Sequence, residues 1–238
     1  MEKVETNFIA FDFSEIAQKA EALRKKHEAQ EAKERQEREQ IRRAKLWNDA
    51  LKMIPEVYKE TLREKRLDMS GEWGYKCGIA RGYLRQDGRF ISILGPTGVG
   101  KSTMAAVLCQ DACLSLGMSC EWYRADSLLM QIQQTFSSKW NGENQRWNTQ
   151  IQAIDELGRP RVLVLDDYNY NTEWSMKIIR ELFSRRYEYG KSAGKKITII
   201  TSNLQIYEYN TLFEKATADR ISSCQSTIEF SASTPSRR

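Results

Sequence analysis

The chain has 238 residues, of which 40% are hydrophobic and 29% are charged, and its formal net charge is +5. This length allows one substantial core with an appendage, and the modest positive charge is compatible with a nucleic-acid partner without requiring one. No apolar run approaches the roughly 18–20 residues that cross a bilayer, which argues against a membrane-spanning protein. The N-terminal residues lack the basic start and apolar run of a secretion signal, so we expect a cytoplasmic protein.

Cysteine usage gives no sign of a disulfide framework or a zinc site. The five cysteines, at positions 77, 109, 113, 120 and 224, form no C-x-x-C pair, and His27 is the only histidine. Cys109 and Cys113 fall on one face of a predicted helix, where core packing is the simpler interpretation. We therefore expect five reduced thiols.

The first predicted element is a long, charged helix between Ser14 and Met53. Strong helix formers dominate this stretch, no proline or glycine interrupts it, and Ser14 suits the N-cap position. Residues 24–40 carry no large apolar side chain, so this part is predicted to be solvated. We expect residues 1–53 to form a helical charged arm and residues 54–238 to form a second domain.

Apolar residues lie at both ends of the arm, and two interpretations stay open. One is a solvated or partly disordered spacer. The other, which we favour, is a surface that docks to a partner protein. The apolar residues are Phe8, Ile9, Phe11, Phe13 and Ile16 at one end and Ile41, Leu46, Trp47, Ala50 and Leu51 at the other.

From Ile54 onward the pattern alternates between strands and helices. Short apolar runs occur at Phe90–Leu94, Val162–Leu165 and Ile197–Ile200, with helical periodicity between them. Nearly continuous apolar strands that alternate with helices are typical of a parallel sheet covered on both faces. The sequence therefore predicts an α/β domain.

A phosphate-binding loop follows the first of these strands. The pattern Gly95-x4-Gly100-Lys101-Ser102 lies between a strand and the start of a helix, the context that the motif requires, and an ordinary glycine-rich turn is the weaker alternative. Backbone N–H groups would bind phosphate oxygens, Lys101 would reach the β- and γ-phosphates, and Ser102 would ligate Mg²⁺. We predict that ATP with Mg²⁺ binds here, through Gly95, Pro96, Thr97, Gly98, Val99, Gly100, Lys101, Ser102 and Thr103.

Polar residues end the other two predicted strands. Asp166 and Asp167 follow the second strand, where Asp166 would hold Mg²⁺ and Asp167 would polarise an attacking water. A strand-to-turn boundary is the alternative for this pair. Asn203 follows the third strand and would orient water at the γ-phosphate, unless the Ser-Asn pair only forms a turn.

These elements, in this order and spacing, resemble the DnaC/IstB family of AAA+ ATPases, which are bacterial and phage replicative-helicase loaders and their transposition relatives. The resemblance covers about Met53 to Arg238 and implies a P-loop NTPase fold. Its specific pieces, beyond the phosphate-binding loop, are Met53–Tyr58, Ala125–Leu129, Thr135-Phe136, Leu165–Tyr168, Leu182–Glu188, Thr201–Leu204 and Asp219–Ile221.

The resemblance also implies roles for single residues. Asp166 and Asp167 match the metal-binding and catalytic carboxylates, and Asn203 matches the sensor. Arg220 matches an arginine finger that acts on ATP bound to the adjacent subunit, which implies a homo-oligomer. Lys215 is a second possibility for that finger, and from the residues alone Arg220 reads as a surface arginine.

Phe136 matches a position that contacts single-stranded DNA in such loaders, and Lys139 lies close by in the sequence. Base stacking with a phosphate contact would suit this pair, although an aromatic residue at a helix end is more often part of a core. The nearby Tyr168–Trp174 stretch is rich in tyrosine, asparagine and tryptophan and could line the same channel.

By this resemblance the chain is expected to be an ATPase that loads a hexameric replicative helicase onto single-stranded DNA, with the arm as the helicase-binding part. A bacterial cell, or a phage within it, is the expected setting. The alternative is an IstB-like transposition helper that assembles on duplex DNA. A translocating viral-type helicase is a third and weaker possibility.

Overall fold

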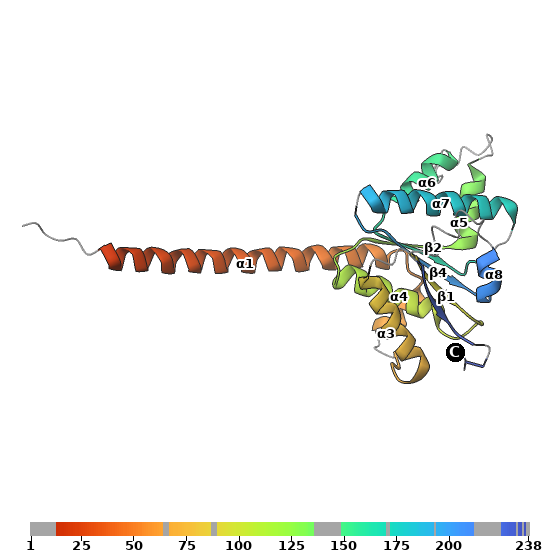
Figure 1. Cartoon of the computed structure of the whole chain (residues 1–238), viewed down its shortest axis with the longest axis horizontal. Helices are drawn as coiled ribbons and strands as arrows, with labels where there is room; N and C mark the ends of the chain where they lie inside the picture. The colour runs from red at the N-terminus through yellow and green to blue at the C-terminus, as the bar shows by residue number, and fades with distance from the viewer. Residues whose placement is uncertain are drawn as a thin grey trace, which may run out of the picture. The chain divides into compact units, whose positions relative to one another are not determined.

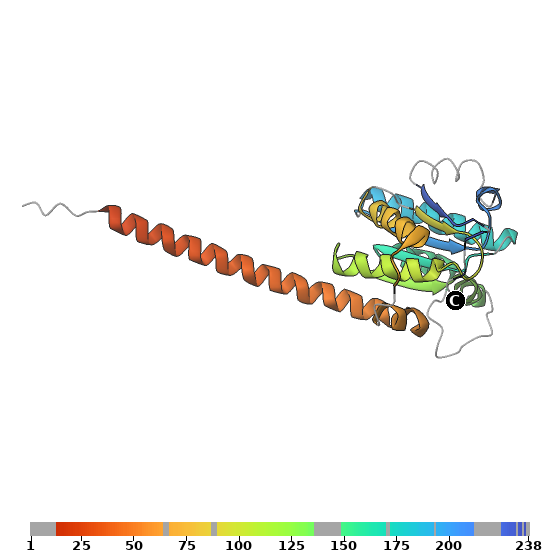
Figure 2. The same ribbon diagram turned by 90° about the horizontal axis from the view of Figure 1, so that it is seen from below.

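The computed structural model describes residues 13–63, 67–86, 90–135, 149–169, 172–192, 194–211, 225–231, 233–234 and 236. The chain divides into two compact units, Met1–Arg42 and Arg43–Arg238. Helix α1 (Phe13–Leu51) begins in the first unit and ends in the second, which confirms the predicted long helix (Figure 1; Figure 2). Within the described residues no helix combines the length and the hydrophobicity that a membrane span requires.

The described part of the first unit is a charged helix. Every side chain from residue 18 to residue 38 is exposed, as expected for a stretch without large apolar residues. Ion pairs one turn apart support the helix, each by a few tenths of a kcal/mol. They join Arg24 to Glu28, Lys25 to Glu21 and Arg38 to Glu34.

The second unit is built on a five-stranded parallel sheet with the order β2-β3-β4-β1-β5. Its strands are β1 (Phe90–Leu94), β2 (Cys120–Arg124), β3 (Val162–Asp166), β4 (Ile197–Ser202) and β5 (Gln225–Glu229). The three predicted strands, β1, β3 and β4, form the centre and are buried along their whole lengths. The edge strands β2 and β5 have mixed burial, so they carry no continuous apolar signal.

Helices cover both faces of this sheet (Figure 1). One hydrophobic core lies on the side of α3 and α4, and the other lies on the side of α5, α6 and α7. The helices of this unit after α1 are α2 (Glu56–Arg63), α3 (Gly71–Arg85), α4 (Lys101–Leu114), α5 (Ala125–Gln134), α6 (Gln150–Gly158), α7 (Glu173–Ser192) and α8 (Ile206–Thr211). The predicted α/β architecture is confirmed.

The last turns of α1 belong to the core of the second unit. Ala50 is 2% exposed, and Leu46 and Trp47 pack against the same core. These residues are therefore not the free docking surface that the sequence suggested, because their apolar atoms are already covered. Ile41 is 71% exposed. The N-terminal apolar residues Phe8, Ile9 and Phe11, and the side chains of Phe13 and Ile16, lie outside the described part of the chain.

The cysteines within the described residues are buried and free, as expected from their spacing. Cys109, Cys113 and Cys120 pack together between α4 and β2, where the Cys120 thiol donates to the carbonyl oxygen of Cys109 at 3.6 Å. Burial raises the pKa of the Cys77 thiol. Within the described chain no group of His, Cys, Asp or Glu residues could hold a metal ion by itself.

Candidate functional site

The loop between β1 and α4 has the backbone shape that a phosphate requires. Gly95, Gly98 and Gly100 have φ values of 138°, 90° and 88°, a region that side chains other than glycine rarely adopt. Gly95 also lies against Phe230, and a Cβ atom at Gly95 would come within 2.7 Å of the Phe230 backbone oxygen. The loop thus turns tightly and delivers the chain to the N-terminus of α4, where unpaired N–H groups attract anions.

Lys101 is buried at the centre of this loop. Its Nζ atom donates to the carbonyl oxygens of Gly95 and Pro96 and to Oδ1 of Asn203, each at 2.8 Å. The side chain is 7% exposed. The ammonium group therefore links the loop to the end of β4, 102 residues further along the chain.

The two aspartates at the end of β3 have different surroundings. Asp166 is 4% exposed and accepts a hydrogen bond from the Thr201 hydroxyl at 2.6 Å. Asp167 is exposed and has a left-handed backbone with φ of 59°. Its backbone N–H donates to the same Thr201 hydroxyl oxygen at 2.8 Å, so Thr201 on the neighbouring strand fixes both residues.

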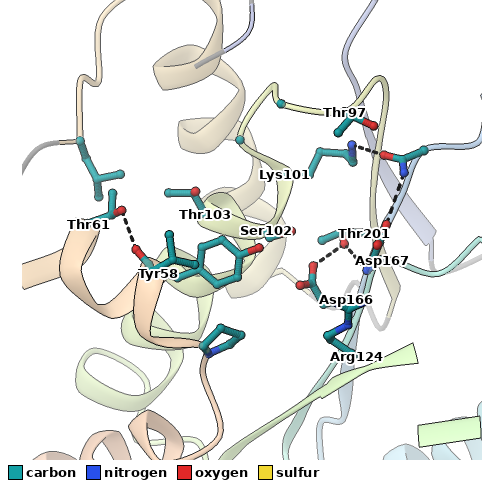
Figure 3. A pocket seen from close by; sticks show the side chains of 16 residues that line it. Tyr58, Thr61, Thr97, Lys101, Ser102, Thr103, Arg124, Asp166, Asp167 and Thr201 are labelled. Atoms are coloured by element: carbon teal, nitrogen blue, oxygen red, sulfur yellow. Dashed lines mark hydrogen bonds between the residues drawn. The ribbon is translucent and has the colours of Figure 1, made fainter. Parts of the chain in front are cut away.

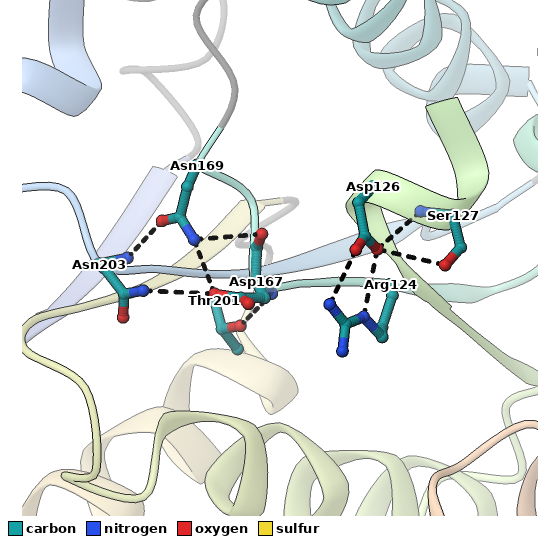
Figure 4. Close-up of polar contacts among 7 residues, drawn as sticks. All are labelled: Arg124, Asp126, Ser127, Asp167, Asn169, Thr201 and Asn203. Atoms are coloured by element: carbon teal, nitrogen blue, oxygen red, sulfur yellow. Dashed lines mark hydrogen bonds and ion pairs between the residues drawn. The ribbon is translucent and has the colours of Figure 1, made fainter. Parts of the chain in front are cut away.

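Asn203 and Asn169 join the two strand ends into one polar network (Figure 4). The Asp167 carboxylate accepts from Nδ2 of Asn169 at 2.7 Å and from Nδ2 of Asn203 at 3.3 Å. Oδ1 of Asn169 in turn accepts from the backbone N–H of Asn203 at 2.8 Å. The amide of Asn203 thus lies between Lys101 and Asp167.

These groups face one cavity of about 680 Å³ (Figure 3). Its lining includes nine of the predicted site residues: Thr97, Gly98, Gly100, Lys101, Ser102, Thr103, Asp166, Asp167 and Asn203. Gly95 and Pro96 take part through the carbonyl oxygens that Lys101 contacts. Val99 is 1% exposed and belongs to the hydrophobic core instead.

One wall of the cavity comes from α2 and its flanks, which the sequence did not assign to the site. Pro55, Val57, Tyr58, Thr61 and Leu67 line it. Tyr58 lies beside Ser102 in Figure 3, and its ring contacts that of Trp122 with 5.8 Å between centroids. The family-like stretch Met53–Tyr58 was the available signal, but it does not reveal that this stretch covers the phosphate-binding loop.

Arg124 is a second lining residue that the sequence did not assign. It ends β2 and pairs in register with Asp166 on β3. Asp126 holds its guanidinium, with Nη2 to Oδ2 at 2.7 Å and Nε to Oδ1 at 3.1 Å (Figure 4). The sequence carried no clear signal for this position, because β2 mixes polar with apolar residues.

The donor set fits a magnesium ion. Burial raises the pKa of the Asp166 carboxyl, and hydrogen bonds from Thr201 and Ser102 partly oppose that rise. A hydroxyl and a carboxylate that lie side by side are oxygen ligands of the kind that Mg²⁺ prefers, usually with waters completing the shell. Ser102 and Asp166 would be these two ligands.

Four predicted contacts lie outside the described residues. They are the arginine-finger candidates Arg220 and Lys215 and the DNA-contact candidates Phe136 and Lys139. Their roles stay predictions.

Comparison with known proteins places the chain in a family. The family described as IstB-like ATP binding protein matches residues 80–222, more than half of the chain. A comparison with curated protein sequences finds no match.

Among solved structures, the crystal structure of DnaI is similar to the chain with a TM-score of 0.51 and 16% identity, over 72% of this chain and 88% of that one. At this identity the likeness shows a shared fold. The DnaC helicase loader has a TM-score of 0.48 and 17% identity over 64% of this chain and 86% of that one. DnaA from Aquifex aeolicus has a TM-score of 0.48 and 15% identity over 64% of this chain and 44% of that one.

Proposed function

Because the chain belongs to the DnaC/IstB type of AAA+ proteins, as the IstB-like ATP-binding family match establishes, we propose that it is a magnesium-dependent ATPase that loads a replicative helicase onto single-stranded DNA. The observation that carries the ATPase part is the contact of Lys101 with both the phosphate-binding loop and Asn203. One ammonium group thereby joins the residues that would hold the phosphates to those that would act on the last one.

The proposed chemistry assigns each group a task. Lys101 would exchange its carbonyl partners for the β- and γ-phosphate oxygens, since an ammonium group binds the more negative acceptor more strongly. Mg²⁺, when bound through Ser102 and Asp166, would neutralise charge on the phosphates. Asp167 would accept a proton from the attacking water, and the Asn203 amide would orient that water, because both already contact each other at the strand ends.

A complete site would need a cation from the adjacent subunit. Arg220, or alternatively Lys215, would stabilise the negative charge that develops on the transferred phosphoryl group. Assembly and hydrolysis would then be linked, because a single subunit would lack this cation. ATP would favour the assembled, DNA-bound state, and hydrolysis would release it.

The N-terminal arm would bind the helicase, and Phe136 with Lys139 would contact single-stranded DNA. This part rests on the family resemblance and on the exposed, charged character of the described arm. The family match to IstB-like proteins favours one alternative, a transposition helper that assembles on duplex DNA.

Nucleotide binding is tested by Lys101→Ala. The variant should lose binding of a fluorescent ATP analogue, because no other cation is described at the centre of the loop. Lys52→Ala is the matched control, since Lys52 is exposed and pairs with Asp49 on α1. Unchanged affinity in Lys101→Ala would refute the proposed site.

The loading function is tested by co-elution of the purified protein with a replicative helicase in the presence of ATP. Replacement of Phe8, Phe11 and Phe13 by alanine should abolish co-elution and leave nucleotide binding intact. ATP-dependent filaments on duplex DNA without helicase binding would support the transposition helper instead. Strand unwinding by the protein alone would support a translocating helicase.

A further inference from the structure

A cluster of positive charges lies at the edge of the sheet opposite the nucleotide cavity. Arg161 and Lys196 directly precede β3 and β4, and the N–H of Ile197 donates to the carbonyl oxygen of Arg161 at 2.8 Å. Because β3 and β4 are neighbours with Val162 opposite Ile197, the two cations lie side by side. The guanidinium of Arg161 packs over Gly194, where a Cβ would be 3.4 Å from its Nη1 atom.

The loop before β3 turns its carbonyl groups inward, toward two buried cations. Arg186 on α7 is fully buried, and its Nη1 atom donates to the carbonyl oxygens of Leu157 and Pro160. Lys196, which is 7% exposed, donates to the carbonyl oxygen of Arg159. These carbonyl oxygens bind the two buried cations, Arg186 and Lys196. They make no contact of this kind with the side chains of Arg159 and Arg161.

The cluster has no directly paired carboxylate among the described residues. Within the described residues Arg159, Arg161 and Lys196 form no ion pair with a carboxylate, and Nε of Arg161 is buried without a hydrogen bond. Arg159 is exposed and Arg161 is half-buried. The pKa of Lys196 is lowered by burial and by the like charges of Arg186 and Arg161. Glu121, on β2, is the carboxylate that attracts Arg186.

This edge is separate from the nucleotide cavity. Arg161 and Asp166 stand at opposite ends of β3, and five steps along a strand correspond to about 16 Å. A ligand at one end would leave the contacts of Lys101, Asp167 and Asn203 untouched.

We propose that this end of the sheet, formed by Arg159 and Arg161 together with the exposed Lys191 at the end of α7, binds the phosphate backbone of a nucleic acid. Guanidinium groups match the geometry of phosphate oxygens. Cations that are spread over several residues suit a row of phosphates better than one small anion. Contacts to phosphates carry no base information, so the binding is independent of nucleotide sequence.

The test measures the salt dependence of binding with the whole protein, without nucleotide and without helicase. A short labelled oligonucleotide, single-stranded or duplex, is titrated by fluorescence anisotropy between about 50 and 200 mM salt. Arg159→Gln/Arg161→Gln should weaken binding about tenfold at the lower salt. If both residues contact a single strand, the negative slope of log K against log salt should become shallower by about 1.4.

Two further variants make the result decisive. Arg42→Gln/Lys52→Gln removes the same charge from residues that already pair with Glu39 and Asp49, and it should bind like the unaltered protein. Arg159→Lys/Arg161→Lys should keep most of the salt slope, since it keeps the charge.

Three results would overturn the proposal. The Gln variant and the Arg42/Lys52 control could have equal affinity and salt slope, the Lys variant could lose as much affinity as the Gln variant, or the unaltered protein could fail to bind. Because nucleotide and helicase are absent, failure of the proposed loading function would not alter this result.

Discussion

The left-handed backbone at Asp167 is compatible with aspartate at this position. Aspartate and asparagine adopt that region several-fold more often than most other residues, because their short polar side chains bond locally. The carboxylate of Asp167 accepts from Asn169, two residues later. A longer glutamate would reach further into the cavity but would fit this backbone less well.

Asp166 lowers the stability of the fold at neutral pH. Burial raises its folded-state pKa above the ordinary value of 3.8, so the native chain binds the proton more tightly than the unfolded chain. The free energy of unfolding therefore falls as the pH rises through the interval between 3.8 and the raised pKa, and the loss is complete above it.

Asp166→Asn should accordingly raise the free energy of unfolding at pH 7, measured by urea titration without nucleotide. Its amide oxygen can still accept from Thr201, and the gain should disappear when the pH is lowered below the interval. Asp49→Asn is the control, because Lys52 lowers the pKa of Asp49, and this exchange should not stabilise the protein. A gain that persists at low pH would contradict the argument.

Tyr58 lies beside Ser102, the residue proposed to hold Mg²⁺ (Figure 3). Burial raises the pKa of the Tyr58 hydroxyl, and the neighbouring Ser102 hydroxyl partly opposes that rise. Tyr58→Phe should therefore strengthen Mg²⁺-dependent nucleotide binding by about 2–10-fold, the equivalent of one net hydrogen bond. Tyr75→Phe, at a tyrosine that is 72% exposed on α3, should change nothing. Weaker binding in Tyr58→Phe would show that the hydroxyl supports the bound state.

At the scale of whole elements, Arg186 ties three of them together. From α7 it donates to the C-terminal end of α6 and to Thr198 and Ile197 of β4. Burial lowers its pKa to about 9, which leaves the guanidinium charged, with all its donors, at neutral pH. The adjacent Arg185 instead pairs with Asp155 near the surface.

Arg186→Lys should destabilise the protein by roughly 2–4 kcal/mol, because a single ammonium group cannot satisfy acceptors that are spread around a planar fork. Arg185→Lys should cost less than about 1 kcal/mol, as is usual for partly exposed ion pairs. Urea unfolding measures both. Equal effects in the two variants would show that the buried contacts of Arg186 add nothing.

The same scale shows why the sequence predicted some elements and not others. β1, β3 and β4 are central and buried on both faces, so their sequences are continuous apolar runs. β2 and β5 lie at the edges and mix polar with apolar residues.

In the candidate site, too, some residues could be predicted from the sequence and others could not. The residues that follow the central strands could be predicted, since parallel strands end at one edge. The wall formed by α2 could not, because Tyr58 is 44 residues before Ser102 and only tertiary packing brings them together.

At the scale of the whole molecule, α1 contributes to two units. Its charged part lies in Met1–Arg42, whereas Leu46, Trp47 and Ala50 help to build the core of Arg43–Arg238. The predicted domain boundary at residue 53 stays a prediction, and deletion variants test it.

Removal of residues 1–42 should leave the melting temperature and nucleotide affinity nearly unchanged. Removal of residues 1–53 should lower stability by several kcal/mol, since it strips Leu46, Trp47 and Ala50 from the core, and loss of one large core side chain costs about 2–5 kcal/mol. Thermal unfolding of the two shortened chains decides the matter. Equal melting temperatures would place the boundary at residue 53.

The ammonium group of Lys101 is bonded to three oxygen atoms of the protein itself. They are the carbonyl oxygens of Gly95 and Pro96 and the side-chain oxygen of Asn203. Departure of a nucleotide would then be an exchange of one set of oxygens for another, with no buried charge left stranded in between. A site built this way could release one nucleotide and bind the next without local unfolding.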